Sequence, residues 1–369
     1  MPSAEERAFF DRIRDEPNDD GPRLLYADWL DDNGQSDRAE FVRLQCALAR
    51  LPDDDPRRPD LRERERQLLE ANEAAWTAGI TPLVTAWVFR RGVIDSVSVE
   101  ATSFLDGGDA LFALAPVRKV RFPGVGDRLP RLAKSPLLRL VRELDFSGND
   151  LGNRGPTLLA RSPHLERLDA LDLSFTELGD RGLAAIAGAP VFGALRSLQI
   201  NDDTRIGGPG IRAVAESPHL TALAELDVSG NGLSNVDLQP LFDGPPAHRL
   251  VRLVLPTNRL GDAGTAAFVA SPVFARMAER DRMIDLRRVE MGPAGARALA
   301  ASPALVQVEA LDLEGNALGD AGLTALAESP YLTQLRVLSL RENRISDDGV
   351  RALARSPLME TLRVLDLTG

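Results

Sequence analysis

The feature that most constrains this chain is an internal repeat that keeps its phase from residue 144 to residue 365. Its clearest copies are LDFSGNDLGNRGPTLLARSP (144–163), LDLSFTELGDRGLAAIAGAP (171–190) and LDLEGNALGDAGLTALAESP (311–330). The anchor residues, spaced by 27, 27, 28, 27, 31, 27, 27 and 27, are Leu144, Leu171, Leu198, Leu226, Leu253, Ile284, Leu311, Leu338 and Leu365. Two shorter, degenerate units are expected before them, near Val97 and Val120. Such units must stack, because one unit cannot bury its leucine face alone.

Each unit reads LxxLxLxxNxLGDxGxxxLAxSP, which predicts a short strand followed by a helix. The recurring Asn is expected to satisfy backbone groups where the chain leaves the strand, at Asn149, Asn231, Asn258, Asn316 and Asn343. The Asp of the Gly-Asp pair is predicted to cap the helix that it starts, at Asp180, Asp262, Asp320 and Asp347. The next Gly lets that helix approach its strand, and Ser-Pro closes it.

The unit resembles the leucine-rich repeat of the long ribonuclease-inhibitor type, over residues 90–369. The resemblance implies an α/β solenoid, a leucine-rich repeat horseshoe of about 9–10 repeats of 27–28 residues with a parallel concave sheet and convex helices. Val289 departs from it by standing where Asn is usual, and the four extra residues in FARMAERDR (274–282) are expected to project as a loop at the helix side or the rim. The last strand has no polar cap, which leaves open a truncated array or pairing with another chain.

Residues 1–80 do not follow the repeat and are predicted to form a small all-α N-terminal domain, with the solenoid at 81–369. Asn33-Gly34 is expected to end one helix, and Asp37 with Glu40 to start the next through a capping box. These assignments give the carboxylates of YADWLDDNGQSDRAEFVRLQ (26–45) structural work in a joint between two helices, with the aromatic side chains facing inward. A calcium loop needs a late bidentate Glu that this stretch lacks.

The same stretch resembles the repeat-companion domain found ahead of leucine-rich-like repeats in planctomycetes and myxobacteria, through YADWL and RAEFVRLQ. WVFRRGVIDSVSV (87–99) is similar to the usual entry into those repeats. The resemblance implies an interaction protein and supplies no catalytic residues.

Charge and composition exclude several classes of function. The net charge is −11, and residues 1–75 hold 20 acidic residues against 12 arginines, so no nucleic-acid partner is expected. A basic protein partner is accommodated more easily. The start of the chain lacks a signal peptide and no apolar run is long enough to span a membrane, so we expect a soluble, cytoplasmic protein of unknown oligomeric state.

No arrangement of residues supports catalysis, a metal or a cofactor, so the chain is predicted not to be an enzyme. The sequence contains no HExxH, CxxC, GxSxG or GxxxxGK[ST] motif. His164 and His219 occupy the same position in units two apart, too far to share a metal, and we expect them to be surface residues. Cys46 is expected to be a small buried residue.

Partner-binding residues are predicted on the concave face, where the residue after six of the nine anchors is Asp. The residue two further along varies between units, as a recognition surface requires. The candidate partner-binding residues are Asp145, Asp172, Asp227, Asp285, Asp312, Arg287, Glu314 and Arg341. The alternative, that these Asp are solvated residues of the repeat consensus, stays open.

The pattern favours a non-enzymatic scaffold that binds a protein partner on the concave face. The alternative is a regulator of an enzyme: an inhibitor of a basic hydrolase, or a GTPase activator of the ribonuclease-inhibitor-like type. Assembly through the last strand is a third, structural role.

Overall fold

The computed structural model describes residues 2–203 and 205–369. The chain divides between Asn149 and Asp150 into two compact units, which we call the first and the second unit. The predicted α/β solenoid is confirmed, because parallel strands alternate with helices in both units. The domain boundary at residues 80 and 81 stays a prediction; it lies between the last helix of the N-terminal segment and the first strand.

The first unit opens with four helices, as predicted: α1 (Ala4–Asp15), α2 (Gly21–Asp32), α3 (Ser36–Arg50) and α4 (Arg58–Thr77). Asn33 ends α2, and Gly34 follows it with a φ of 74°. Tyr26 of α2 is fully buried, and its ring packs against the rings of Phe10 and Trp29 at centroid distances of 5.6 and 5.9 Å. The aromatic residues of this joint therefore face inward, as the sequence predicts.

The predicted capping box at the start of α3 is wrong. The helix begins at Ser36 and no side chain caps it. The Glu40 carboxylate instead accepts two hydrogen bonds, of 2.7 and 2.6 Å, from the Arg64 guanidinium of α4. Glu40 lies one turn into α3, so its side chain reaches the neighbouring helix more easily than the helix start.

The motif RAEFVRLQ (38–45) holds α3 against the hairpin of β1 (Ala86–Arg90) and β2 (Val93–Ser98). The hairpin turn contains Gly92, at a φ of 87°, and a Cβ there would lie 2.3 Å from the Val42 Cα. The Gly92 N–H donates to the Gln45 side-chain oxygen at 2.6 Å, and the Phe41 ring meets the Phe89 ring edge-on at 5.3 Å. The motif thus joins the helical segment to the first repeat strands.

Two degenerate repeats follow in the first unit, as predicted. Val97 of β2 pairs in parallel register with Val120 of β3 (Lys119–Arg121), and Val120 pairs with Leu144 of β4 (Glu143–Asp145). The helices α5 (Ala101–Leu114) and α6 (Leu129–Leu132) lie between these strands in sequence.

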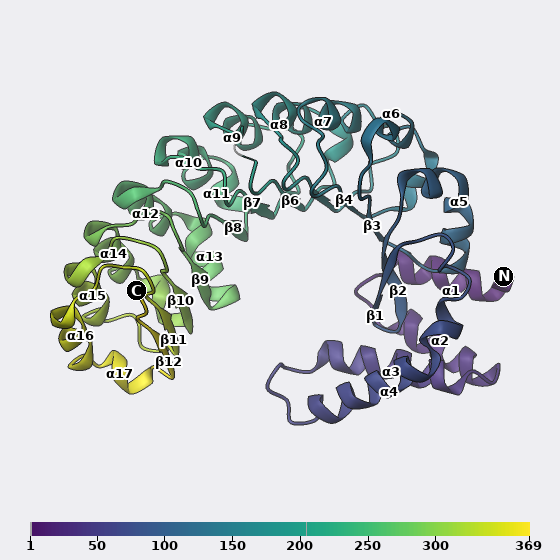
Figure 1. The fold of residues 1–369 in the computed structure, drawn as a ribbon, viewed down its shortest axis with the longest axis horizontal. Helices are drawn as coiled ribbons and strands as arrows, with labels where there is room; N and C mark the ends of the chain where they lie inside the picture. Colours follow the sequence, from purple (N-terminus) through teal and green to yellow (C-terminus); the bar gives the residue numbers. More distant parts are fainter. Residues whose placement is uncertain (1, 204) are drawn as a thin grey trace. The chain divides into compact units, whose positions relative to one another are not determined.

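Among the described residues of the second unit there are eight repeat strands, which line the inner side of its curve in Figure 1, with most of the helices on the outer side. The strands are β5 (Ala170–Asp172), β6 (Ser197–Gln199), β7 (Glu225–Asp227), β8 (Arg252–Val254), β9 (Met283–Asp285), β10 (Ala310–Asp312), β11 (Val337–Ser339) and β12 (Val364–Asp366). The helices are α7 (Arg154–Leu159), α8 (Asp180–Ala187), α9 (Gly208–Ala215), α10 (Asn235–Phe242), α11 (Pro246–Arg249), α12 (Gly261–Val269), α13 (Pro272–Asp281), α14 (Pro293–Ala300), α15 (Gly319–Ala327), α16 (Asp347–Ala354) and α17 (Leu358–Thr361).

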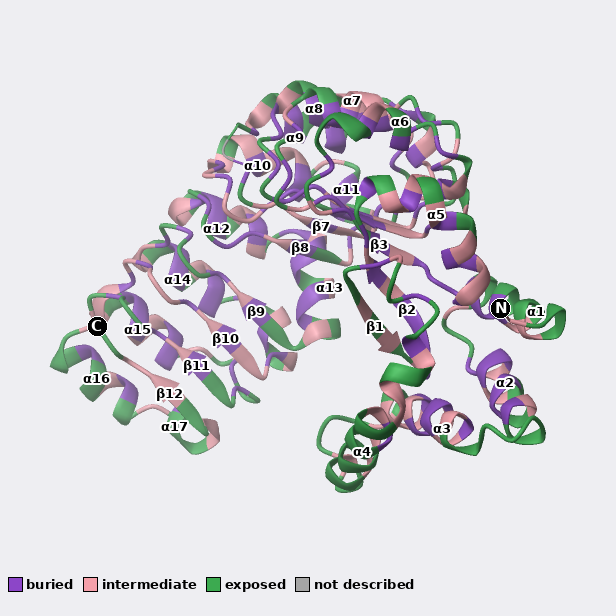
Figure 2. Ribbon diagram, turned by 45° about the vertical axis from the view of Figure 1, so that its right-hand side comes forward, coloured by how far each residue is buried: buried purple, intermediate pink, exposed green. Residues whose placement is uncertain are grey.

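The core of the second unit lies between its strands and helices, where buried residues gather in Figure 2. The anchor residues pair in register along β5–β8 and along β9–β12. From Leu171 to Leu338 they are at most 1% exposed, so burial of this column holds the repeats together.

The recurring Asn residues form a buried ladder of hydrogen bonds between repeats, which confirms their structural role. The Asn258 amide donates to the carbonyls of Val228 and Leu255 at 3.0 and 2.8 Å, and its oxygen accepts from the Leu233 N–H at 2.8 Å. Asn316 and Asn343 bond in the same way. Each Asn satisfies backbone groups of its own repeat and of the preceding one.

Three repeats fill the ladder position with another residue: Thr176, Asp203 and the expected Val289. Asp203 is 1% exposed; its Oδ1 accepts from the N–H groups of Thr176 and Leu178 at 2.7 and 3.1 Å. Its Oδ2 is buried and, within the described chain, has no hydrogen-bond partner. Burial therefore raises the pKa of Asp203 to about 6, against the opposing effect of the backbone donors.

The predicted helix caps act one repeat further along than expected. Asp180 does not cap α8; its Oδ1 accepts from the N–H groups of Gly207 and Gly210, at 2.8 and 3.0 Å, where α9 begins. Asp262 does the same for α14, and Asp320 for Ser346 at the start of α16. The recurring glycine leaves room for this carboxylate: a Cβ at Gly210 would lie 2.7 Å from the Asp180 Oδ1.

The insertion at 274–282 is a helix and not the predicted loop. Residues Pro272–Asp281 form α13, capped by the Ser271 hydroxyl, and α13 contacts both β8 and β9. Its apolar face is buried through Val273, Phe274 and Ala278. The insertion is therefore a helix with one face in the core, whereas Glu279, Arg280 and Arg282 at its C-terminal end are exposed.

Candidate partner-binding face

Where Asp follows an anchor, it shapes the end of its strand. In the second unit the Oδ1 atoms of Asp172, Asp227, Asp285 and Asp312 accept the backbone N–H two residues later, at 2.9 to 3.1 Å. Asp145 of the first unit does the same with Ser147 at 2.9 Å, and is only 8% exposed. Each of these carboxylates fixes the turn that leaves its strand, which is a structural role compatible with both the partner-binding and the consensus interpretation.

The inner face is the side of strands β5–β12 that faces away from the helices. Side chains alternate along a strand, so the residues before and after each anchor point to this face together. From the sequence, site residues are predicted at the position after the anchor and at the one two residues further on. The position before the anchor also belongs to this face, and it holds Glu225 and Arg252.

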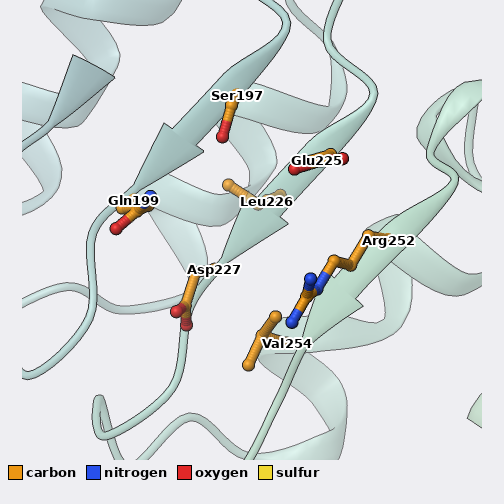
Figure 3. A pocket seen from close by; sticks show the side chains of 7 residues that line it. All are labelled: Ser197, Gln199, Glu225, Leu226, Asp227, Arg252 and Val254. Carbon is orange, nitrogen blue, oxygen red and sulfur yellow. The ribbon is translucent and has the colours of Figure 1, made fainter. Parts of the chain in front are cut away.

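A polar hollow of about 180 Å³ lies on the inner face over β6, β7 and β8 (Figure 3). Its lining residues are Ser197, Gln199, Glu225, Leu226, Asp227, Arg252 and Val254. The guanidinium of Arg280, on α13, lies 3.1 Å from the Glu225 carboxylate. The guanidinium of Arg252 has no hydrogen-bond or ion-pair partner among the residues that the structure describes, although its backbone N–H donates to the Ala224 carbonyl at 3.1 Å.

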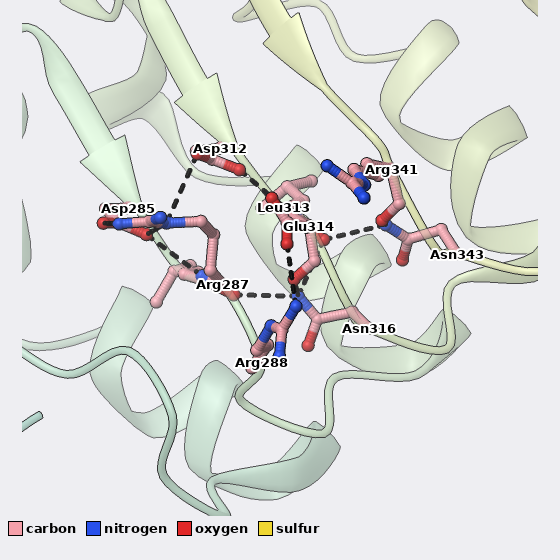
Figure 4. A network of polar contacts seen from close by, with 10 residues as sticks. Asp285, Arg287, Arg288, Asp312, Leu313, Glu314, Asn316, Arg341 and Asn343 are labelled. Carbon is pink, nitrogen blue, oxygen red and sulfur yellow. Dashed lines mark hydrogen bonds and ion pairs between the residues drawn. The ribbon is translucent and has the colours of Figure 1, made fainter. Parts of the chain in front are cut away.

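A second polar cluster covers β9, β10 and β11 and is largely self-neutralised (Figure 4). The Arg287 guanidinium bonds Asp285 at 2.9 and 2.7 Å and lies 3.3 Å from Asp312. Arg288 pairs with Glu314 at 3.0 Å. Hydrogen bonding to Asp285 holds the pKa of Arg287 above its usual range, so this arginine is charged at any accessible pH.

The structure therefore separates the predicted site residues into three groups. Asp285, Arg287, Asp312 and Glu314 lie together in the cluster of Figure 4; Arg341 is drawn beside them and approaches Glu342 at 3.8 Å. Asp172 and Asp227 lie on β5 and β7 and, within residues 2–203 and 205–369, have no cation within ion-pair distance. Asp145 belongs to the first unit, where Arg121 lies 3.9 Å away.

The described residues contain no group of three or more His, Cys, Asp or Glu side chains placed to hold a metal ion. Cys46 is buried, and burial raises the pKa of its thiol to about 12, which agrees with a packing role. None of the helices in the described part of the chain is both long and apolar enough to cross a membrane.

Comparisons with known proteins agree with the repeat. Four segments match the family described as Leucine Rich repeat: residues 138–160, 161–187, 308–327 and 331–354. The repeats are leucine-rich repeats, as predicted; their ribonuclease-inhibitor type and the companion domain stay predictions. The sequence matches no curated protein.

Several solved structures are similar to parts of the fold at low identity. An internalin, inlF from Listeria monocytogenes, shares 18% identity over 70% of each chain with a TM-score of 0.42. The complex of Rad7 and Elc1 in yeast gives 12% identity over 100% of this chain and 87% of that one, with a TM-score of 0.44. The TLR13–ssRNA13 complex gives 15% identity over 68% and 36%, with a TM-score of 0.39.

Proposed function

From a stack of leucine-rich repeats, we propose that this chain is a non-enzymatic scaffold that binds a protein partner on the inner face of β5–β8. The observation that carries the proposal is that Asp172 and Asp227 lack an ion-pair partner within the described chain. One oxygen of each is fixed by a backbone N–H, and no cation in the described chain neutralises either carboxylate. Two preorganised anions on a shared surface favour a basic partner surface.

The salt-bridged cluster on β9–β11 is a less favourable surface for a basic partner than the inner face of β5–β8. Asp285 and Asp312 already share Arg287, so a basic partner gains less from them than from the free carboxylates. Exposed ion pairs contribute about 0.2–1 kcal/mol each, and a partner would have to break existing ones there. The first four strands of the second unit are therefore the better docking surface.

The test is affinity capture from a lysate of the source organism, followed by a dissociation constant for the purified partner. Two double variants carry the same change of charge: Asp172→Asn with Asp227→Asn, and Asp285→Asn with Asp312→Asn. Asn keeps the side-chain oxygen that accepts the backbone N–H, so both variants should fold.

We expect the first pair to weaken binding about tenfold, with a reduced dependence on salt, and the second pair to change it little. Equal capture of the same proteins by wild type and by both variants would contradict docking on the inner face.

A further inference from the structure

The parallel sheet of the second unit is interrupted between β8 and β9. In the described chain, no backbone hydrogen bond joins these two strands, although β8 pairs with β7 and β9 pairs with β10. Bonding between the two repeats resumes beyond the strands, where the Thr257 N–H donates to the Arg287 carbonyl at 3.0 Å. The interruption is therefore local to the strands, and we call it the slot.

The inserted helix α13 produces the slot. Its Met277 is 8% exposed, and the Met277 sulfur accepts the Leu253 N–H at 3.4 Å, in the place of a strand carbonyl. A thioether is a weak acceptor on a flexible side chain, so it can be displaced by a stronger one.

The slot leaves backbone groups without their usual partners. Two residues after each anchor, the N–H groups of Ile200, Val228, Leu286 and Leu313 donate to the next repeat at 2.9 to 3.1 Å. Leu255 holds the same position at the slot and is 1% exposed, yet its N–H has no partner among the described residues. Such a group costs stability until a carbonyl or water satisfies it.

The slot opens into a hollow of about 320 Å³ on the inner face. Apolar side chains of Val254, Met277 and Met283 line it, and Met283 is 51% exposed. Arg252 also lines it, and its side chain is unpaired within the described chain. The two carboxylates of the lining are already engaged, since Asp285 binds Arg287 at 2.7 Å and Asp281 lies 3.6 Å from Arg280. Among the described residues of the lining, Arg252 is therefore the charged side chain without a partner.

We propose that the slot binds an extended polypeptide segment of the partner, with an acidic side chain on Arg252 and an apolar one on Met283. The proposal rests on the proposed scaffold function, and it specifies the conformation of the partner segment that binds in the slot. An extended chain fits because its carbonyls supply the acceptors that the strand edges lack, and its side chains alternate between the apolar wall and the inner face. The Met277 sulfur withdraws when a carbonyl takes the Leu253 N–H.

Amide hydrogen exchange of the free protein tests whether the slot is open in solution. We expect the Leu255 amide to exchange at least tenfold faster than those of Val228 and Leu313, which occupy the same position in closed repeats. An equally slow Leu255 amide would show that the strands close, and would overturn the proposal.

Binding is tested with a displayed library of random dodecapeptides selected on the full chain. We expect enriched peptides to carry Asp or Glu next to an apolar residue, to slow exchange of the Leu255 amide, and to lose at least tenfold in affinity on Arg252→Gln. Arg336→Gln removes the same charge at an exposed position outside the slot and should change affinity less than twofold.

Failure to enrich any peptide overturns the proposal, and so do peptides that bind both variants equally and leave Leu255 unprotected. Asp172→Asn with Asp227→Asn should leave these peptides bound while weakening the basic partner. The slot and the scaffold function can therefore fail independently.

Discussion

The two runs of strands in the second unit, β5–β8 and β9–β12, share a frame and differ on the inner face. Both bury the anchor residues from Leu171 to Leu338, and in both an Asp turn ends some of the strands: Asp172 and Asp227 in the first run, Asp285 and Asp312 in the second. In β5–β8 the carboxylates of Asp172 and Asp227 are unpaired within the described chain, whereas in β9–β12 Arg287 bridges Asp285 and Asp312. In the repeat, one carboxylate oxygen of the Asp therefore fixes the turn. Residues at other positions of the repeat decide whether the charge of that Asp is neutralised.

Removing a ladder amide should cause the largest loss, equally in both runs. Asn258→Ala and Asn316→Ala each leave buried carbonyls and N–H groups unpaired. We expect each to lower the free energy of unfolding by about 3–5 kcal/mol, since each orphaned buried group costs about 1–3 kcal/mol. Urea denaturation followed by circular dichroism measures it. A loss under 1 kcal/mol in one run alone would show that the frames differ.

Asp203, which takes the place of a ladder Asn in the first run, should make stability depend on pH. Because folding raises the pKa of Asp203 to about 6, the carboxyl stabilises the fold while protonated. That contribution is fully present below pH about 4 and is lost as the pH rises through about 6.

Asp203→Asn supplies an amide that can donate like Asn231, and should add up to about 3 kcal/mol at pH 8 and little at pH 4. Thermal unfolding across this range measures the difference. Asp202→Asn, next to it in sequence, is the control and should leave most of the pH dependence.

The Asp turn should contribute less, and separably from charge. Asp227 accepts from both the N–H and the hydroxyl of Ser229, at 2.9 and 2.6 Å. Asp227→Ala should cost about 1 kcal/mol, whereas Asp227→Asn should cost under about 0.5 kcal/mol because its oxygen still accepts the N–H. Equal losses in chemical denaturation would mean that the charge, and not the turn, stabilises the strand end.

The smallest effect on stability is expected from making the second run resemble the first. Arg287→Gln frees the carboxylates of Asp285 and Asp312. The side chain of Arg287 is 45% exposed, so we expect a loss of only about 0.5 kcal/mol. Affinity for the basic partner should change little, because docking is proposed on β5–β8; calorimetry would measure it, and a marked rise would extend the docking surface to β9 and β10.

The strand register and the Asn ladder could be predicted because both recur with the period of the sequence. Which helix Asp180 caps could not be predicted from the sequence. The helix of its own repeat and the helix of the next repeat both begin with free N–H groups of the same kind. The course of α13 depended on tertiary packing: Met277 becomes an apolar wedge only where β8 and β9 meet it. Free and paired carboxylates are equally invisible in sequence, since arginines are abundant throughout the chain.

The caps that cross from one repeat to the next are answered by bonds that run the opposite way. Asp180 completes the start of α9 and Asp262 that of α14, so these two helices depend on the repeat that precedes them in the chain. The Asn ladder works in reverse, because Asn258 satisfies the Val228 carbonyl and the Leu233 N–H of the repeat before it. Neighbouring repeats therefore complete each other, which ties the stability of each repeat to the folding of the next.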